Sequence, residues 1–179
     1  MTSRLFDQIV FGPVRSRRFG VSLGINLLPV DAKVCSFDCV YCECGWTDHA
    51  SIKGLPSDED VAQNLEAKLQ HMQKEGELPD VITFSGNGEP TMHPKFDIII
   101  DNTIALREKY APDAKVVVLS NSTQLHKEIV RNALRKIDNA VLKLDSTNED
   151  QFMRINKPAP GIEVDEVMWD LLNFKGIAS

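Results

Sequence analysis

The stretch Val34-Cys35-Ser36-Phe37-Asp38-Cys39-Val40-Tyr41-Cys42 places three thiols on one short loop, at the spacing C-x3-C-x2-C. Cysteine thiolates are the usual ligands of iron–sulfur clusters, and several cysteines at close, uneven spacing are how a loop wraps one. A four-iron cubane normally takes four protein ligands, so three would leave one iron open for another ligand, as catalytic metal sites do. The loop therefore predicts a four-iron cluster bound by Cys35, Cys39 and Cys42.

A zinc site or a disulfide would suit these cysteines less well. A structural zinc site usually combines two Cys or Cys/His pairs far apart in sequence, and the chain has no second pair. The three thiols are too close together for a disulfide to close a useful loop. Cys44 follows Cys42 by two positions; it could compete for the open iron or be a redox-sensitive thiol, but we interpret it as a small apolar bystander.

Composition limits the class of protein. A length of 179 residues is typical of one domain, and the apolar content is sufficient for a core. The net charge of −6 does not favour binding of nucleic acid by most of the surface. No apolar run is long enough to span a bilayer, and the first residues lack the layout of a signal peptide. All four cysteines lie within residues 35–44, a usage that fits a reducing cytoplasm.

Apolar strands and amphipathic helices alternate four times along the chain. We expect strands at 21–27, 80–84, 115–119 and 140–145, and helices at 57–76, 94–109, 124–135 and 164–174. Residues 1–20 indicate only turns, at their Gly and Pro positions. This alternation predicts an α/β fold, a parallel sheet with right-handed crossovers and outer helices.

Polar residues follow the expected strands, at the end where such folds place their sites. The strand 80–84 runs into Ser85-Gly86-Asn87-Gly88-Glu89-Pro90, whose glycines let backbone approach a ligand closely. Asn121 follows the next strand, and Asp145 and Ser146 end the last one. Lys143 alternates with Asp145 and so points the same way; an ion pair between them explains both residues without any function.

The cysteine spacing, with Tyr41 before the last cysteine, closely resembles the signature of radical S-adenosylmethionine (SAM) enzymes, and Gly88-Glu89-Pro90 resembles the end of their GGEP motif. The resemblance implies a partial (βα) barrel, a [4Fe-4S] cluster and SAM as cofactors, and reductive cleavage of SAM to a 5′-deoxyadenosyl radical. The metal ligands it implies are Cys35, Cys39 and Cys42. The cofactor-binding residues it implies are Tyr41, Gly86, Asn87, Gly88, Glu89, Pro90, Asn121, Asp145 and Ser146. Catalytic residues other than these are not assigned.

Within the superfamily, Phe11-Gly12-Pro13 with Ser16-Arg17-Arg18, and the strand before the cysteines, resemble the proteins grouped with wyosine-type tRNA-modification enzymes. The implied partners are an electron donor of flavodoxin or ferredoxin type and a substrate that is RNA or a protein, with no membrane. Alternatives are an activase of glycyl-radical enzymes and a non-catalytic iron–sulfur electron carrier. Because the radical SAM barrel usually has six βα units and four are visible, we expect residues 1–179 to be one core domain, either truncated after the fourth unit or an unusually short member.

Overall fold

A five-stranded sheet forms the centre of the protein. The computed structural model describes residues 4–17, 19–47 and 54–174, and within them the strand order is β1-β2-β3-β4-β5. The strands are β1 (Val10–Ser16), β2 (Gly20–Ile25), β3 (Val81–Phe84), β4 (Lys115–Ser120) and β5 (Asn139–Leu142). Strands β2 to β5 are parallel, and β1 pairs with β2 in the antiparallel direction. The predicted α/β fold with a parallel sheet is confirmed.

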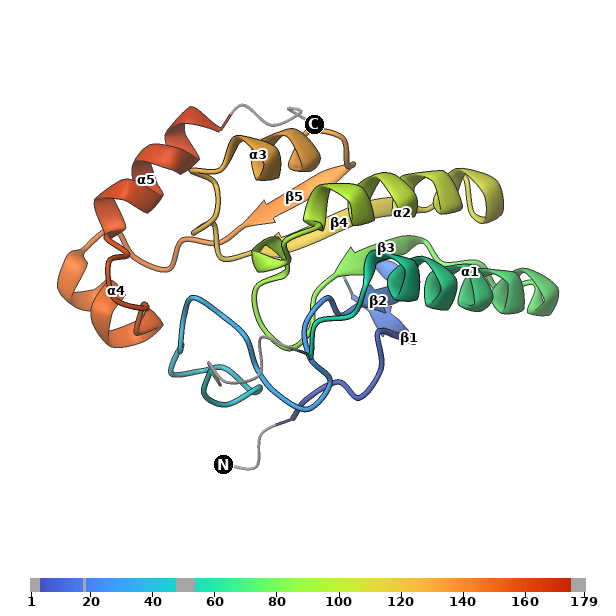
Figure 1. The fold of residues 1–179 in the computed structure, drawn as a ribbon, viewed down its shortest axis with the longest axis horizontal. Coiled ribbons are helices and arrows are strands. Elements are labelled where there is room, and N and C mark those ends of the chain that lie inside the picture. The colour runs from blue at the N-terminus through green and yellow to red at the C-terminus, as the bar shows by residue number, and fades with distance from the viewer. Residues whose placement is uncertain (1–3, 18, 48–53, 175–179) are drawn as a thin grey trace.

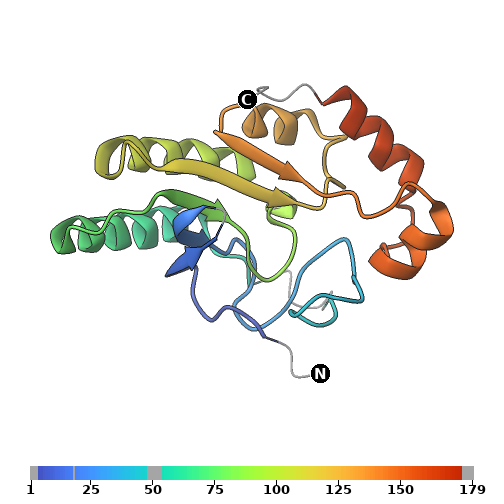
Figure 2. The ribbon, with the colours of Figure 1, turned by 180° about the vertical axis from the view of Figure 1, so that it is seen from behind.

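The helices divide into two groups. Figure 1 shows α1 (Asp58–Glu75), α2 (Phe96–Tyr110) and α3 (Glu128–Leu134) on one face of the sheet, and the view from behind shows the strands in front of them (Figure 2). The short helices α4 (Glu149–Asn156) and α5 (Val164–Asn173) follow β5 and lie beyond the ends of the strands to which the arrows point (Figure 1). They stand beside the cysteine loop.

Helix α1 shows how local sequence sets an element. The Ser57 side chain accepts a hydrogen bond from the Asp60 N–H and the Asp60 carboxylate accepts one from the Ser57 N–H, which is a capping box. Val61, Leu65 and Leu69 recur at helical spacing and are buried, as the sequence predicts. Gly76 ends the helix in the left-handed conformation.

Three sequence-based expectations are wrong, and the first concerns the last strand, which is expected at 140–145 but ends at Leu142. Residues 10–16 form a strand at the edge of the sheet rather than only turns. Its register shifts between Phe11 and Val14, and this irregularity hides the period of two that marks a strand. The third helix begins at Glu128 and not at 124, which leaves Ile129 53% exposed while Leu125 and Leu134 are buried. Arg18 and His49 lie outside the described residues.

Two apolar clusters hold the fold. The larger lies between the sheet and α1, α2 and α3, and includes Val116 and Val118 of β4, both fully buried. The smaller consists of Phe37, Phe152, Val164 and Val167, with Cys35 and Cys39 packed against it. Phe37 belongs to the cysteine loop and Phe152 to α4, and their rings meet edge to face at 5.4 Å between centroids. This contact fastens the cysteine loop to the helices beyond β5.

The described part of the chain contains no helix with the length and apolar character needed to cross a membrane.

Candidate functional site

The cysteine loop and the glycine-rich loop are joined by backbone hydrogen bonds. The Val34 N–H donates to the Asn87 carbonyl at 2.9 Å, and the Glu89 N–H donates to the Val34 carbonyl at 3.1 Å. Since the glycine-rich loop starts directly after β3, both loops lie at the carboxyl end of the parallel strands. The two motifs that the sequence singles out therefore meet at one end of the sheet.

The other flank of the cysteine loop pairs with residues 155–159, at the end of α4. The Val40 N–H donates to the Ile155 carbonyl at 2.9 Å and the Asp38 N–H to the Lys157 carbonyl at 3.1 Å. The Ala159 N–H donates to the Ser36 carbonyl at 2.9 Å. The cysteine loop is thus held on both sides by segments distant in sequence.

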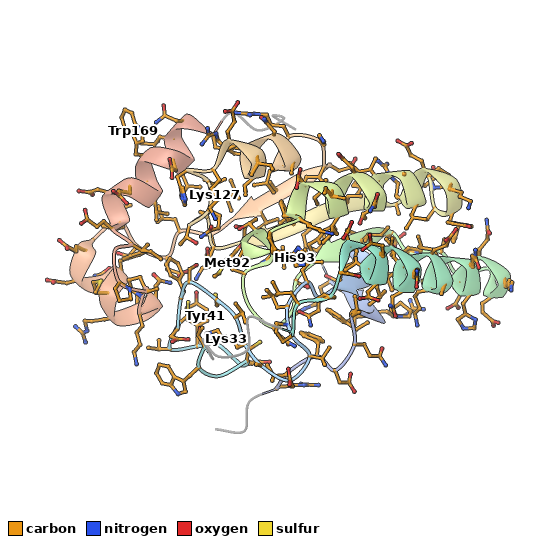
Figure 3. The ribbon with its side chains drawn as sticks, in the orientation of Figure 1. Lys33, Tyr41, Met92, His93, Lys127 and Trp169 are labelled. Atoms are coloured by element: carbon orange, nitrogen blue, oxygen red, sulfur yellow. The ribbon has the colours of Figure 1, made fainter. Side chains whose placement is uncertain are left out.

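A buried lysine fixes the shape of the cysteine loop, and sequence reasoning missed it. Lys33 Nζ lies 2.9 Å from Asp38 Oδ1 and donates to the Gly45 carbonyl at 3.0 Å, while its side chain is only 1% exposed. The same Asp38 oxygen accepts bonds from the N–H and the hydroxyl of Thr47. Burial works against the charge on Lys33, but the bond to Asp38 and the nearby thiols raise its pKa, so it stays an ammonium. Figure 3 labels Lys33 in this loop, near Tyr41.

Nitrogen donors surround two of the three predicted ligand sulfurs. Cys35 Sγ accepts from the Phe37 N–H at 3.4 Å and from Asn121 Nδ2 at 3.6 Å. Cys39 Sγ accepts from Lys143 Nζ at 3.3 Å and from Asn156 Nδ2 at 3.5 Å. Burial raises the pKa of the Cys35 thiol to about 12, and a bound metal would reverse this rise because metals bind the thiolate.

Lys143 is the centre of a polar network beyond β5. Its ammonium lies 2.9 Å from Asp145 Oδ2, which is the ion pair that the sequence offers as an alternative to a functional role, and 2.7 Å from the Tyr41 hydroxyl. The Tyr41 hydroxyl donates to Asp145 Oδ2 at 2.6 Å, and Asn156 Nδ2 also donates to that oxygen. Burial opposes the charge of Lys143, but the bonds to Asp145 and Tyr41 outweigh it and raise the pKa. The sequence indicates only that residues 154–158, Asn156 among them, line the same opening as Asp145.

Glu89 is buried and fully hydrogen-bonded. One carboxylate oxygen accepts from the N–H and hydroxyl of Thr91 and from the Ser120 hydroxyl, and the other accepts from the Asn121 N–H at 2.6 Å. Burial raises its pKa, and these donors oppose the rise. The side chain thus faces the interior beside β4 rather than solvent, and it is linked to Cys35 through Asn121.

The glycines of the second loop are needed for close packing against the Val34 backbone and the Asn26 side chain. Gly88 has φ of 140°, and a Cβ there would lie 1.8 Å from the Val34 carbonyl oxygen. Gly86 has φ of 154°, and its Cβ would lie 2.4 Å from Asn26 Oδ1. Both positions exclude side chains. The two glycines are therefore required by contacts within the protein, without reference to a ligand.

The remaining predicted cofactor-binding residues have varied surroundings. The Asn87 side chain is fully buried and is bonded to the backbone of Phe6 and Pro29. Pro90 begins the short 3-10 helix η2 (Pro90–Met92). Ser146 accepts from the Asn148 N–H in the turn before α4. Tyr41, Asn121 and Asp145 are the predicted residues that the network ties most directly to the cysteines.

A pocket of about 770 Å³ opens beside the cysteine loop, with Cys39, Cys42 and Cys44 in its lining. The Cys44 thiol donates to the Gly86 carbonyl at 3.6 Å. Burial, followed by the charge of Cys42, raises the pKa of Cys44 to about 11. Cys44 stays a predicted bystander, because its thiol is already bonded to the glycine-rich loop.

The donor set suits an iron–sulfur cluster. Among the described residues, no three His, Cys, Asp or Glu side chains are grouped so that they could hold a single metal ion. The three thiols on one loop, with N–H donors aimed at Cys35 and Cys39, have the chemistry of cluster ligation, in which hydrogen bonds to the sulfurs stabilise thiolates.

Comparison with known proteins decides the family. The profile described as "Radical SAM superfamily" matches residues 30–175. The chain belongs to the radical SAM superfamily. Members of this superfamily use a [4Fe-4S] cluster and SAM, which are the cofactors that the resemblance implies.

Its curated relatives include proteins named only by family. The chain is 34% identical to the UPF0026 protein MJ1312 of Methanocaldococcus jannaschii over 169 residues, 93% of this chain and 50% of that protein. It is 36% identical to the UPF0026 protein slr1464 of Synechocystis over 168 residues, 93% of this chain and 59% of that protein. The chain therefore spans about half the length of the curated relatives it matches.

A solved radical SAM structure shows the same fold. The structure of anSMEcpe with bound AdoMet superposes with a TM-score of 0.57 at 20% identity, over 87% of this chain and 42% of that one. The likeness confirms that the sheet and its outer helices are part of a radical SAM (βα) barrel.

Proposed function

We propose that this protein binds a [4Fe-4S] cluster through Cys35, Cys39 and Cys42 and uses it to cleave SAM reductively. One electron from the cluster breaks the bond between the sulfonium and the 5′ carbon, which gives methionine and a 5′-deoxyadenosyl radical that takes a hydrogen atom from a substrate. The electron comes from a protein donor of flavodoxin or ferredoxin type. The substrate we propose is RNA or a partner protein.

The observation that carries this proposal is the pairing of Val34 with Asn87 and Glu89. It brings the loop with three thiols against the glycine-rich loop, so a ligand held by the second loop lies beside a cluster held by the first. An electron carrier needs a cluster but no adjoining ligand loop, so this pairing favours an enzyme. The Gly86 to Pro90 backbone, with Asn121 directly after β4 and Asp145 in the segment between β5 and α4, is the proposed SAM site.

The test is product analysis. The protein is reconstituted anaerobically with iron and sulfide, and incubated with SAM and dithionite. We expect 5′-deoxyadenosine and methionine, with none formed without dithionite or in a Cys39→Ala variant. A reconstituted protein that carries the cluster and forms no 5′-deoxyadenosine would contradict the proposal and favour the electron carrier.

A further inference from the structure

Cys39 differs from Cys35 in the kind of donors that reach its sulfur. Lys143 brings an ammonium to 3.3 Å from Cys39 Sγ, and Asn156 brings an amide N–H to 3.5 Å. At Cys35 both donors are neutral, the Phe37 N–H and the Asn121 amide. Among the hydrogen bonds of the described residues, Lys143 is therefore the one cation that contacts a predicted ligand sulfur, and that sulfur belongs to Cys39.

The ammonium is held in place by other side chains. Lys143 lies directly after β5, and its Nζ is also bonded to the Tyr41 hydroxyl at 2.7 Å and to Asp145 Oδ2 at 2.9 Å. It stands 5.2 Å from the ring centroids of both Phe37 and Tyr41, so aromatic faces also favour the cation. A lysine held by so many contacts keeps a fixed distance to the sulfur.

Asn156 is fully buried at the end of α4, and its amide nitrogen donates to Cys39 and Asp145. The oxygen of its side-chain amide, Oδ1, is buried and has no hydrogen-bond partner among the described residues. Buried polar atoms without a partner are rare, so such an atom needs a physical reason. The reason here is the position of the amide nitrogen: the orientation that lets it donate to Cys39 and Asp145 leaves the side-chain oxygen without a donor.

We propose that Lys143 and Asn156 set the reduction potential of the cluster through Cys39, with Asp145 and Tyr41 as positioning residues that hold the ammonium at the sulfur. The inference rests on the proposed function, because it assigns Cys39 to the cluster. Reduction adds one negative charge to the cluster, and hydrogen bonds to the sulfurs together with nearby positive charge stabilise that charge. The ammonium makes direct contact with the sulfur, whereas Asp145 reaches it through Lys143 and Asn156.

The test is a redox titration of the cluster-loaded protein without SAM. The electron paramagnetic resonance signal of the reduced cluster monitors the titration. In Lys143→Met we expect the ratio of reduced to oxidised cluster at the wild-type midpoint to fall about tenfold, a shift of about 59 mV to lower potential for one electron. Lys143→Arg keeps the charge and should stay near wild type. The matched control is Lys136→Met, which removes an exposed ammonium that pairs with Asp101 away from the cysteines.

A wild-type potential in cluster-loaded Lys143→Met would overturn the inference. Weaker SAM binding in that variant with an unchanged SAM-free potential would also overturn it and assign the ammonium to SAM. If Lys143→Met fails to take up a cluster, Asn156→Ser decides by the same titration, again with a shift to lower potential expected and an unchanged value contradicting the inference. Failure of the proposed function looks different: the wild-type protein itself would form no 5′-deoxyadenosine.

Discussion

The Glu89 carboxylate accepts the Asn121 N–H at 2.6 Å, which fastens the loop after β3 to the tip of β4. Asn121 in turn donates from its amide to Cys35 Sγ and to the Ser36 hydroxyl. Glu89 therefore connects the glycine-rich loop to the cysteine loop through one residue of β4's tip.

Replacing Glu89 with Ala should weaken both the fold and SAM binding. Loss of the carboxylate leaves the buried Asn121 and Thr91 N–H groups without an acceptor, at a cost of about 1–3 kcal/mol in the free energy of unfolding. Urea denaturation measures this cost. Calorimetry on the cluster-loaded variant should show weaker SAM binding, because the glycine-rich loop loses the hydrogen bond that ties it to Asn121. Glu108→Ala, on the exposed face of α2, is the matched control, and equal SAM affinity in both variants would refute the role of Glu89.

Single replacements of Cys35, Cys39 and Cys42 by Ala should each abolish the brown absorption of the reconstituted protein, because each removes one iron ligand. Iron and sulfide analysis with the visible spectrum checks this. Cys44→Ala is the internal control and should keep the cluster, since Cys44 is bonded to the Gly86 carbonyl. Loss of iron from Cys44→Ala, or wild-type iron content in the three other variants, would reverse these assignments.

Gly88→Ala should be among the most destabilising small substitutions in the chain. The added Cβ would meet the Val34 carbonyl oxygen at 1.8 Å, on backbone with φ of 140°. Overpacking of this kind costs about 1–3 kcal/mol or more, and the two loops would have to separate. Thermal unfolding of Gly88→Ala and of Gly54→Ala tests this, because a Cβ at Gly54 meets only ordinary contacts at 3.8 Å. Equal melting temperatures for the two variants would contradict the packing argument.

His93 should make the fold sensitive to mild acid. It is buried after η2; its Nδ1 accepts from the Lys95 N–H, so Nε2 carries the proton and donates to the Pro56 carbonyl. Burial lowers its pKa, so below about pH 6.5 the unfolded chain binds a proton that the folded protein does not bind. The contribution of His93 to the free energy of unfolding should be fully present above that pH. Below it the free energy of unfolding should fall by up to about 1.4 kcal/mol per pH unit, until the pH reaches the pKa of His93 in the folded protein.

The measurement is the free energy of unfolding by urea from pH 8 to pH 5. His93→Gln should flatten the decline below pH 6.5, whereas replacement of His71, exposed on α1, should leave it unchanged. The same slope in both variants would mean that another group is responsible.

The sequence predicts the sheet well because each parallel strand is a short apolar run followed by a capped or patterned helix. It predicts the place of the site because polar residues at strand ends meet in parallel sheets. It does not reveal β1, whose irregular register interrupts the alternation, nor the late start of α3. It also cannot show Lys33 and Asn156, since nothing in the local pattern tells a buried lysine from a surface one, or a helix-terminal asparagine from a cap. Their roles depend on contacts between distant segments.

The glycines illustrate the same limit. In the sequence, Gly86 and Gly88 indicate room for a ligand, and in the structure their missing side chains first make room for Asn26 and Val34. Packing within the protein therefore explains these two glycines, whether or not a ligand also approaches the loop.

The pairing of residues 36–40 with 155–159 sets an order of events during synthesis. Cys39 is separated from Asn156 by 117 positions, so the thiols leave the ribosome long before the segment that encloses them exists. Until then the cysteine loop lacks one of its two flanking partners and stays open to solution. Residues up to about 159 must therefore be made before the loop can take its final shape, and a cluster delivered after that point enters a site already walled on both sides.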